Sequence, residues 1–586
     1  MPVKNRKLSS KNENQVNNKK QQQQQQDKNR SKQQVETDLN FKISSKWIFI
    51  WFLMARLCSS LWNNINDCDE TFNYWEPGHF LLYGSGFQTW EYSPKYSIRS
   101  YTYLWFYMLP GKLLKNYFEK FEIFYIIRCY MAILSAIVET FLFISIRKSF
   151  GNKNAQYYCL ISSLSTGMFN SMTSFLPSSF AIYAVCLSFG FWLRGNHTFF
   201  IVFFAAGSIL GWPFVSAIGI PMALFYLFSN RYRMKFIRTS IISAIIISLP
   251  IIIIDTYYYG KFVFAPINII LYNVFSEHGS TLYGTEPFSF YLKNLFLNFN
   301  IFFIISLLSI PVLIISSLIN NRMDRLNLQR QILINCSLLV WYLIFFCQSH
   351  KEERFMYPIY PLLCLTTSLT LTNLESIINN NRLQSILIKL LFSIFFLLSL
   401  SRTLALYRGY YSSLNIYHEF WRPPLLDVNN DSNQTSTTKI ICLGKEWHRF
   451  PSNFFIPEKK FQIEFIRSEF RGQLPKYFDK KVKYPTRIEP DDMNDQNQEQ
   501  PERYVNDIQS GCDYIIDTDY PDYSGRDYPY SKHPESWKII KSFWYLNQKQ
   551  SENVFRTFYL PFLFEYKCHF IDYNILINAR KHSKSN

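Results

Sequence analysis

Runs of about 20 apolar residues constrain this chain more than any other feature. Examples are Ile237–Tyr258, Phe296–Leu318 and Ile386–Leu406, and each is long enough to cross the hydrocarbon core of a bilayer. Such runs are confined to about residues 46–408, whereas the preceding residues are almost all polar and the following ones are mixed. One soluble core does not segregate its residues in this way. The sequence therefore predicts a multi-pass α-helical membrane protein.

The distribution of charge predicts its topology. Residues 1–46 form a basic tail rich in Gln and Asn, with too little apolar surface to fold, and the positive-inside rule keeps this tail in the cytosol. The apolar segment 101–109 is too short for a span, so we interpret it as a helix that lies along the membrane. With this interpretation, basic connections on the cytosolic side alternate with loops on the luminal side, over about eleven spans between residues 47 and 408. Loops 63–121 and 260–294 face the lumen in this interpretation.

Residues 409–586 have a different pattern, which predicts a luminal α/β domain. Lys439–Leu443 and Cys512–Ile516 are typical of short strands, and the polar insert Asp491–Gln500 is predicted to be a disordered loop. Asn433 begins an N-glycosylation sequon. Cysteines that could form disulfides in an oxidising lumen are Cys68, Cys442, Cys512 and Cys568, and the sequence leaves their pairing open.

An acidic cluster follows the first apolar run. Asp67, Asp69 and Glu70 lie within four residues, and carboxylates this close raise one another's proton affinity, which suits a general base or a cation site. The alternative is a solvated acidic turn. The segment that follows is rich in aromatic and hydrogen-bonding residues, as in a sugar-binding surface or in the aromatic belt of a membrane protein. Its candidate substrate-binding residues are Asn73, Trp75, Glu76, His79, Gln88, Trp90 and Glu91.

Two later segments add candidate residues. In the second long loop, turn-forming glycines could aim side chains into a pocket, and the candidates are His278, Tyr283 and Glu286. His350, Lys351 and Arg354 lie between two apolar runs and could bind a lipid-linked phosphate, or they could be snorkelling charges at the end of a span. Within one apolar run, Arg128 and Glu139 share a helix face, which favours a structural role.

Together these segments resemble one family. The stretches 67–77 (DCDETFNYWEP), 86–94 (GFQTWEYSP) and 350–355 (HKEERF) closely resemble the dolichyl-phosphate-mannose-dependent α-1,2-mannosyltransferases of glycosyltransferase family 22. These enzymes extend the lipid-linked oligosaccharide used in N-glycosylation. The resemblance covers about residues 47–410. It implies a GT-C fold in the endoplasmic reticulum membrane, a dolichyl phosphate mannose donor and a dolichyl-pyrophosphate-linked oligosaccharide acceptor.

The resemblance also implies roles for the candidate residues. A β-linked donor and an α-linked product require a single inverting displacement, and family members act at two steps. Asp69 would be the base, with Asp67 and Glu70 tuning its proton affinity or orienting the acceptor. Arg99, His350, Lys351 and Arg354 would stabilise the leaving phosphate, so that no metal or other cofactor is expected. The alternatives are a mannosyltransferase of the GPI-anchor pathway and a transporter of lipid-linked oligosaccharides. A transporter would tolerate Asp69→Asn.

Overall fold

The computed structural model describes residues 44–275, 280–319, 324–378, 380–423, 425, 438–457, 459–490, 492–522, 525 and 527–582. The predicted disordered tail, apart from its last three residues, and the sequon at Asn433 lie outside this part of the chain. The protein divides into two compact units, Met1–Phe49 and Ile50–Asn586. The second unit contains nearly all of the described helices and strands.

Within the described residues, five helical stretches are long and apolar enough to cross a membrane, which confirms the predicted class. They are α6 (Lys120–Phe150), α12 (Arg233–Tyr259), α14 and α15 together (Ser289–Leu307 and Ser309–Ile319), α16 (Arg325–Cys347) and α18 (Asn381–Tyr410). Their bounds enclose the apolar runs from which the spans were predicted.

Shorter helices complete the bundle. The structure contains α2 (Ser45–Trp62), α7 (Asn152–Leu164), α8 (Thr166–Ser171), α9 (Pro177–Leu193), α10 (His197–Ala206), α11 (Ile220–Phe228) and α17 (Tyr360–Ile377). The helical turns η3 (Gly207–Gly211) and η4 (Pro213–Gly219) separate α10 from α11. Helix α5 (Tyr101–Leu114) has 14 residues and contains Pro110, so it is too short to span a bilayer, as predicted.

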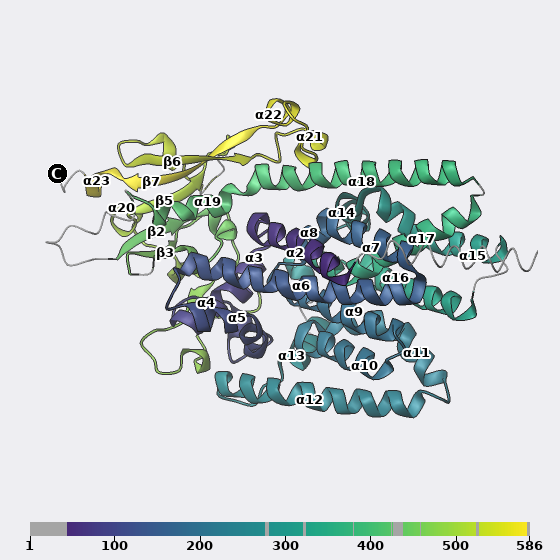
Figure 1. The fold of residues 1–586 in the computed structure, drawn as a ribbon. Helices are drawn as coiled ribbons and strands as arrows, with labels where there is room; N and C mark the ends of the chain where they lie inside the picture. The colour runs from purple at the N-terminus through teal and green to yellow at the C-terminus, as the bar shows by residue number, and fades with distance from the viewer. Residues whose placement is uncertain are drawn as a thin grey trace, which may run out of the picture. The chain divides into compact units, whose positions relative to one another are not determined.

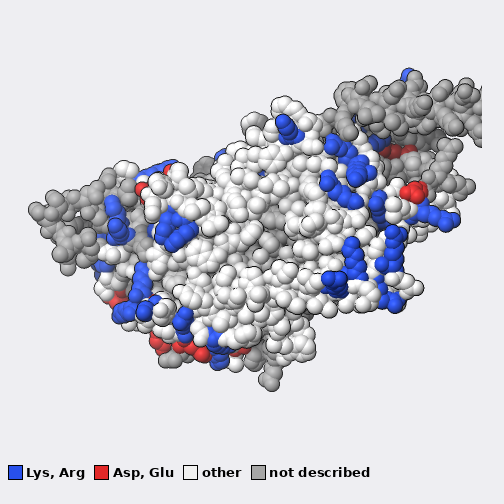
Figure 2. All heavy atoms as spheres, turned by 60° about the horizontal axis from the view of Figure 1, so that its bottom comes forward, with Lys and Arg blue, Asp and Glu red and all other residues white. Residues whose placement is uncertain are grey.

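Helices α12 and α18 lie on opposite sides of the bundle (Figure 1) and are only about one-tenth buried over their apolar windows. Their exposed side chains include Ile241, Ile245 and Leu249 on α12, and Leu390 and Leu397 on α18. Figure 2 shows a wide band without charged side chains across the α12 side, flanked by Lys and Arg. A contiguous apolar surface of this size is typical of contact with lipid.

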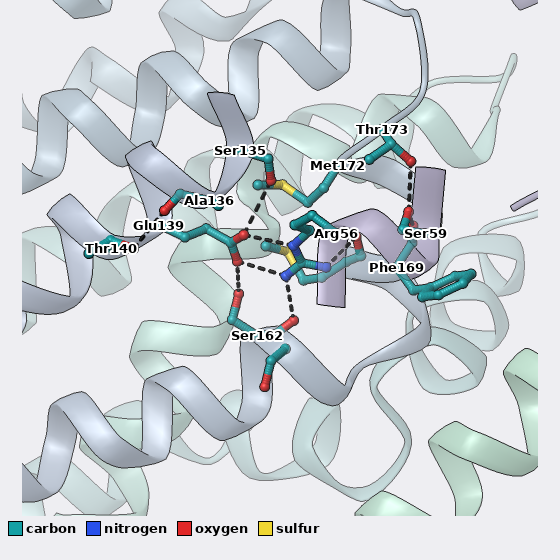
Figure 3. Close-up of polar contacts among 12 residues, drawn as sticks. Arg56, Ser59, Ser135, Ala136, Glu139, Thr140, Ser162, Phe169, Met172 and Thr173 are labelled. Carbon is teal, nitrogen blue, oxygen red and sulfur yellow. Dashed lines mark hydrogen bonds and ion pairs between the residues drawn. The ribbon is translucent and has the colours of Figure 1, made fainter. Parts of the chain in front are cut away.

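A buried ion pair joins the first helices (Figure 3). Arg56 on α2 donates through Nε and Nη2 to the two carboxylate oxygens of Glu139 on α6, each at 2.7 Å, and both side chains are fully buried. The remaining polar atoms contact Ser135, Ser162 and the Met168 carbonyl. Near the end of α2, Arg128 donates to the Ser59 carbonyl at 3.4 Å and, just past the helix, to the Asn63 carbonyl at 2.8 Å. Arg128 and Glu139 therefore face the same helix, as their spacing predicts.

The basic connections gather at one end of the bundle. Arg330 near the start of α16 donates to the Leu193 carbonyl at the end of α9, and Lys153 in α7 pairs with Glu375 near the end of α17. Four exposed cations, Arg231, Arg233, Lys235 and Arg238, lie at the start of α12. Antiparallel spans bring alternate connections to the same end of a bundle, and the side of the membrane that this end faces stays a prediction.

The last part of the chain folds around a five-stranded mixed sheet of order β3-β2-β5-β7-β6. Its strands are β2 (Lys439–Leu443), β3 (Phe461–Phe465), β5 (Tyr514–Thr518), β6 (Trp537–Leu546) and β7 (Phe570–Asn578). The two predicted strands are confirmed, β5 with a shift of two residues. Cys442 and Cys512 form a disulfide, whereas Cys68 and Cys568 are free.

The insert is not a disordered loop, so that prediction is wrong for residues 492–500. Asp492 pairs with Arg503 at 3.1 Å, and Asp495 accepts hydrogen bonds from Tyr96 and Tyr272 at 3.1 and 3.4 Å. The insert is thereby tied to both predicted luminal loops, contacts that its polar composition did not reveal.

Candidate active site

A cavity of about 650 Å³ lies where the two long loops, the 350–355 segment and the C-terminal domain meet. Its walls include Pro177 at the start of α9 and Arg354 just before α17. The opposite ends of these two helices carry Leu193 and Glu375, which lie among the basic connections. The cavity and the basic end are therefore at opposite ends of the bundle.

Two aspartates and one arginine form the centre of the site. Asp67 caps the short helix α3 (Cys68–Glu70) by accepting from the Asp69 backbone N–H at 2.9 Å. Arg354, in the turn η6 (Glu353–Ile359), donates through Nη1 to Asp67 Oδ2 at 2.8 Å and through Nη2 to Asp69 Oδ2 at 2.6 Å. Arg354 also pairs with Glu352. Among the described contacts, Asp69 Oδ1 has no protein partner, and this side chain is 37% exposed toward the cavity.

The two aspartates differ in acidity. Burial raises the pKa of Asp67 to about 7, although the Arg354 charge opposes this shift. Burial alone would also raise the pKa of Asp69, but the positive charges of Arg354 and Arg99 outweigh it and lower the pKa. Asp69 is therefore ionised near neutral pH, while Asp67 is close to its titration midpoint.

His350 supplies a second cation. Its Nδ1 lies 2.9 Å from the Gly284 carbonyl and its Nε2 lies 2.9 Å from a Glu352 carboxylate oxygen. Both partners are acceptors, so both ring nitrogens must donate, which requires the imidazolium form. The hydrogen bond to Glu352 is the main reason that the pKa of His350 is raised.

Arg99 is held rigidly at another wall of the cavity. Its guanidinium forms two hydrogen bonds with Glu91, at 2.7 and 2.9 Å, and donates to the Tyr74 hydroxyl at 2.7 Å. The Arg99 carbonyl accepts from Tyr259 at the end of α12. Glu91 therefore orients Arg99 and offsets much of its charge.

Three further predicted residues line the cavity. Asn73 lies in η1 (Thr71–Trp75) and accepts from the Thr89 hydroxyl at 2.7 Å. Trp90 packs against Tyr272 with ring centroids 4.9 Å apart, and Tyr283 reaches the cavity from the second loop. The structure thus brings together predicted residues from three distant segments, although the prediction for His278 falls outside the described residues.

Other predicted residues from the same motifs point away from the cavity. Glu70 is buried and accepts from Trp75 Nε1 at 3.1 Å and from the Phe175 N–H at 2.9 Å. Glu76 is fully buried and accepts from Ser452 and Asn453 of the C-terminal part. The helical stretch of α3, η1 and α4 (Glu76–Tyr83) turns these side chains inward. The geometry therefore gives these residues structural contacts in place of the catalytic role predicted for Glu70 and the substrate contacts predicted for Trp75 and Glu76.

Four more predicted residues also lie outside the cavity lining, namely His79, Gln88, Glu286 and Lys351. His79 contacts the Ser85 carbonyl and the Phe454 ring. Gln88 is buried in β1 (Phe87–Gln88), which pairs with β4 (Lys476–Tyr477). Lys351 is buried and donates to the Gln348 carbonyl and, at 2.7 Å, to the carbonyl of Glu286. Lys351 therefore joins two loops, and its ammonium group donates to backbone carbonyls and not into the cavity.

The cavity centre is also the place where a cation could bind. The ligand atoms of Asp67, Cys68 and Asp69 lie within 4.8 Å of one another. Arg354 already donates to both carboxylates, so a metal ion would compete with a fixed positive charge.

Comparisons with known proteins identify the family. The sequence model of the Alg9-like mannosyltransferase family matches residues 47–457. The chain is 42% identical to the human alpha-1,2-mannosyltransferase ALG9 over 90% of this chain and 88% of that protein, and 31% identical to the Saccharomyces cerevisiae ALG9 over 88% and 92%. The chain belongs to the Alg9-like mannosyltransferase family.

Two more distant likenesses concern part of the sequence and the fold. GPI mannosyltransferase 3 of Candida albicans is 27% identical over only 56% of this chain and 64% of that protein. Among solved structures, ArnT from Cupriavidus metallidurans bound to undecaprenyl phosphate has a TM-score of 0.50 at 10% identity, and the match covers 81% of this chain and 93% of that one. This likeness shows that the Alg9-like chain shares the fold of that protein.

Several residues that line the cavity were not among the predicted site residues. Glu352 lies in the 350–355 segment beside Glu353, and nothing in that segment indicated that its side chain would join Arg354 to His350. Trp212 and Phe355 stack on the cavity wall with ring centroids 5.3 Å apart, and both lie within the residues that match the family model. Residues of the C-terminal domain also line the cavity, and most of them lie beyond the family match at residue 457. No short motif marks them.

Proposed function

We propose that this chain transfers mannose from dolichyl phosphate mannose to a dolichyl-pyrophosphate-linked oligosaccharide, in α-1,2 linkage, in the endoplasmic reticulum membrane. The relatives that match nine-tenths of the chain are alpha-1,2-mannosyltransferases, which supports the linkage. The observation that carries the proposal is the Asp67–Arg354–Asp69 cluster, which lies at a cavity where the ends of apolar helices meet the C-terminal domain.

The reaction is a single displacement with inversion at the anomeric carbon. The 2-hydroxyl oxygen of the acceptor mannose forms a bond with C1 of the donor mannose. The bond between C1 and the phosphate oxygen breaks, and its electron pair leaves with dolichyl phosphate. The hydroxyl proton moves to Asp69 Oδ1, the oxygen that has no described protein partner. A lowered pKa keeps Asp69 ionised, so the base is ready before the acceptor arrives.

The other charged groups have supporting roles. Arg354 orients both aspartates, and Asp67 uses one oxygen to cap α3 and the other to hold Arg354. The His350 imidazolium and Arg99 are the cations available to the leaving phosphate, whose negative charge grows as the bond breaks. With these fixed cations the reaction needs no metal ion. Restored activity on adding Mn²⁺ after chelation would contradict this.

We also propose eleven spans, with the cavity and the C-terminal domain in the lumen. Helix pairs that continue through a bend count as one span, namely α7 with α8, α10 with η3, η4 with α11, and α14 with α15. Together with α2, α6, α9, α12, α16, α17 and α18 they make eleven. The Cys442–Cys512 disulfide supports a luminal position, because disulfides persist in oxidising compartments. The basic end then faces the cytosol.

The test is the pool of lipid-linked oligosaccharides in cells that lack this protein. We expect an intermediate truncated before an α-1,2-linked mannose, restored by the wild-type chain and not by Asp69→Asn. Two accumulating species of different length, one for each missing α-1,2-mannose, would be the sign of two steps. A normal pool in the deficient cells would contradict the proposal.

A further inference from the structure

Six residues of the C-terminal domain line one side of the cavity, and we name them the C-terminal wall. They are Trp447, Phe470, Gln473, Leu474, Pro475 and Asn497. The wall adjoins the catalytic segment, because Trp447 lies 5.8 Å from the ring of Phe72 and 4.5 Å from the ring of Phe470. It therefore borders the space next to Asp69.

Charge divides the cavity into two halves. Every charged lining residue comes from the membrane-domain segments, namely Asp67, Asp69, Glu91, Arg99, His350, Glu352 and Arg354, whereas the C-terminal wall has none. Phosphate groups of donor and acceptor belong with the cations. A neutral ligand fits the wall, and the neutral part of the two substrates is sugar.

The wall is built and held in shape. Asn497 has a left-handed backbone, with φ of 53°, and its Oδ1 accepts from the Gln473 N–H at 2.9 Å. Gly472 permits this approach, because a Cβ there would lie 2.5 Å from Asn497 Oδ1. Arg503 is buried and joins the Leu474 carbonyl to Asp492 of the insert. The wall is thus preorganised without substrate.

Its chemistry suits carbohydrate. Trp447 and Phe470 are partly exposed aromatic rings that can stack on the C–H faces of a sugar. Asn497 Nδ2 has no partner among the described hydrogen bonds, so it can donate to a sugar hydroxyl. Five of the six residues lie beyond the end of the family match at residue 457.

We infer that the C-terminal wall binds the mannose residues of the acceptor glycan that precede the reacting mannose, and so selects the acceptor. This inference rests on the proposed function. Donor mannose is placed elsewhere, because its phosphate must lie beside Arg99 and His350.

The test uses the purified full-length protein with dolichyl phosphate mannose and two acceptors. One is the lipid-linked oligosaccharide with its mannose branches, and the other is a synthetic lipid-linked acceptor shortened to the reacting mannose. Asn497→Asp keeps the oxygen that holds Gln473 and removes the amide donor, and Phe470→Leu keeps an apolar side chain and removes the ring. For the branched acceptor we expect each variant to raise KM roughly fivefold. The donor KM and kcat should stay within about twofold.

The matched control is Trp544→Leu, which removes an aromatic ring that is 66% exposed on β6 of the same domain. It should behave as wild type, and all variants should show the wild-type unfolding temperature. With the shortened acceptor, Asn497→Asp and Phe470→Leu should match wild type. An unchanged KM for the branched acceptor, or equal losses with both acceptors, would overturn the inference. A wild-type chain that uses neither acceptor would instead reject the proposed function.

Discussion

Two arginine–carboxylate clusters in this protein have similar distances and different surroundings. Arg56 and Glu139 pair one to one and are fully buried. Each guanidinium nitrogen and each carboxylate oxygen has a hydrogen-bond partner (Figure 3). Arg354 faces three carboxylates, and the side chains of Asp67 and Asp69 are 30% and 37% exposed toward the cavity. The Arg56–Glu139 pair, which we call the closed pair, has no polar atom left for a ligand. The Arg354 cluster, which we call the open cluster, has more negative than positive charge and includes Asp69 Oδ1, which has no described protein partner. Full burial of the Arg56–Glu139 pair indicates a role in stability, whereas exposure of the Arg354 cluster to the cavity indicates a role in the reaction.

The largest expected effect is on the open cluster. Asp69→Asn removes the proton acceptor and keeps the shape of the side chain, so we expect kcat to fall roughly 10³-fold. The unfolding temperature should stay at the wild-type value, because the Asn carboxamide oxygen can still accept from Arg354 and the other oxygen of Asp69, Oδ1, has no described protein partner. The measurement is mannose transfer by the purified protein, with Asp572→Asn, an exposed carboxylate on β7, as the control. Wild-type turnover by Asp69→Asn would remove it as the base.

The closed pair should respond in the opposite way. Glu139→Gln leaves the Arg56 charge buried without its counter-ion, and this should lower the free energy of unfolding by about 3 kcal/mol. We expect a lower unfolding temperature and a smaller folded yield, with unchanged kcat in the folded fraction. Replacing both residues by Met should recover most of the loss. A stable Glu139→Gln protein with impaired turnover would break the comparison.

Arg354→Lys tests whether the open cluster needs a planar cation. A lysine ammonium keeps the charge but lacks the fork that contacts both aspartates at 2.6 and 2.8 Å. We expect kcat/KM to fall about a hundredfold. Arg402→Lys is a matched control on α18, where the guanidinium donates to the Thr557 carbonyl. Equal activity of Arg354→Lys and wild type would mean that charge alone suffices.

The smallest effect concerns pH. Burial raises the pKa of Asp67 to about 7, so its carboxyl is protonated below that pH and its hold on Arg354 weakens. The groups that face it are Asp69, Glu352 and Arg354. We expect kcat/KM to fall as the pH decreases through about 7. In Asp67→Asn, which still caps α3, this acid limb should be absent from the pH profile. An unchanged limb would assign it to another group.

The sequence predicted the membrane class and the centre of the site, because both depend on local signals. Apolar runs mark the long helices, and Asp67, Asp69, His350 and Arg354 lie in short dense motifs. The side that each motif residue faces was not predictable, because the first loop contains a helical stretch whose turns send Asn73 to the cavity and Glu70 and Glu76 to the interior. The C-terminal wall was missed because it forms only through long-range contacts, such as those of Asp495 with Tyr96 and Tyr272.

The linkage of the product tests the central claim most directly. Purified full-length protein would be incubated with dolichyl phosphate mannose and the lipid-linked oligosaccharide, and the product digested with a mannosidase specific for α-1,2 bonds. The account predicts that the digestion removes all of the transferred mannose, since one inverting displacement on a β-linked donor gives an α-linked product. Transferred mannose that resists the enzyme would contradict it.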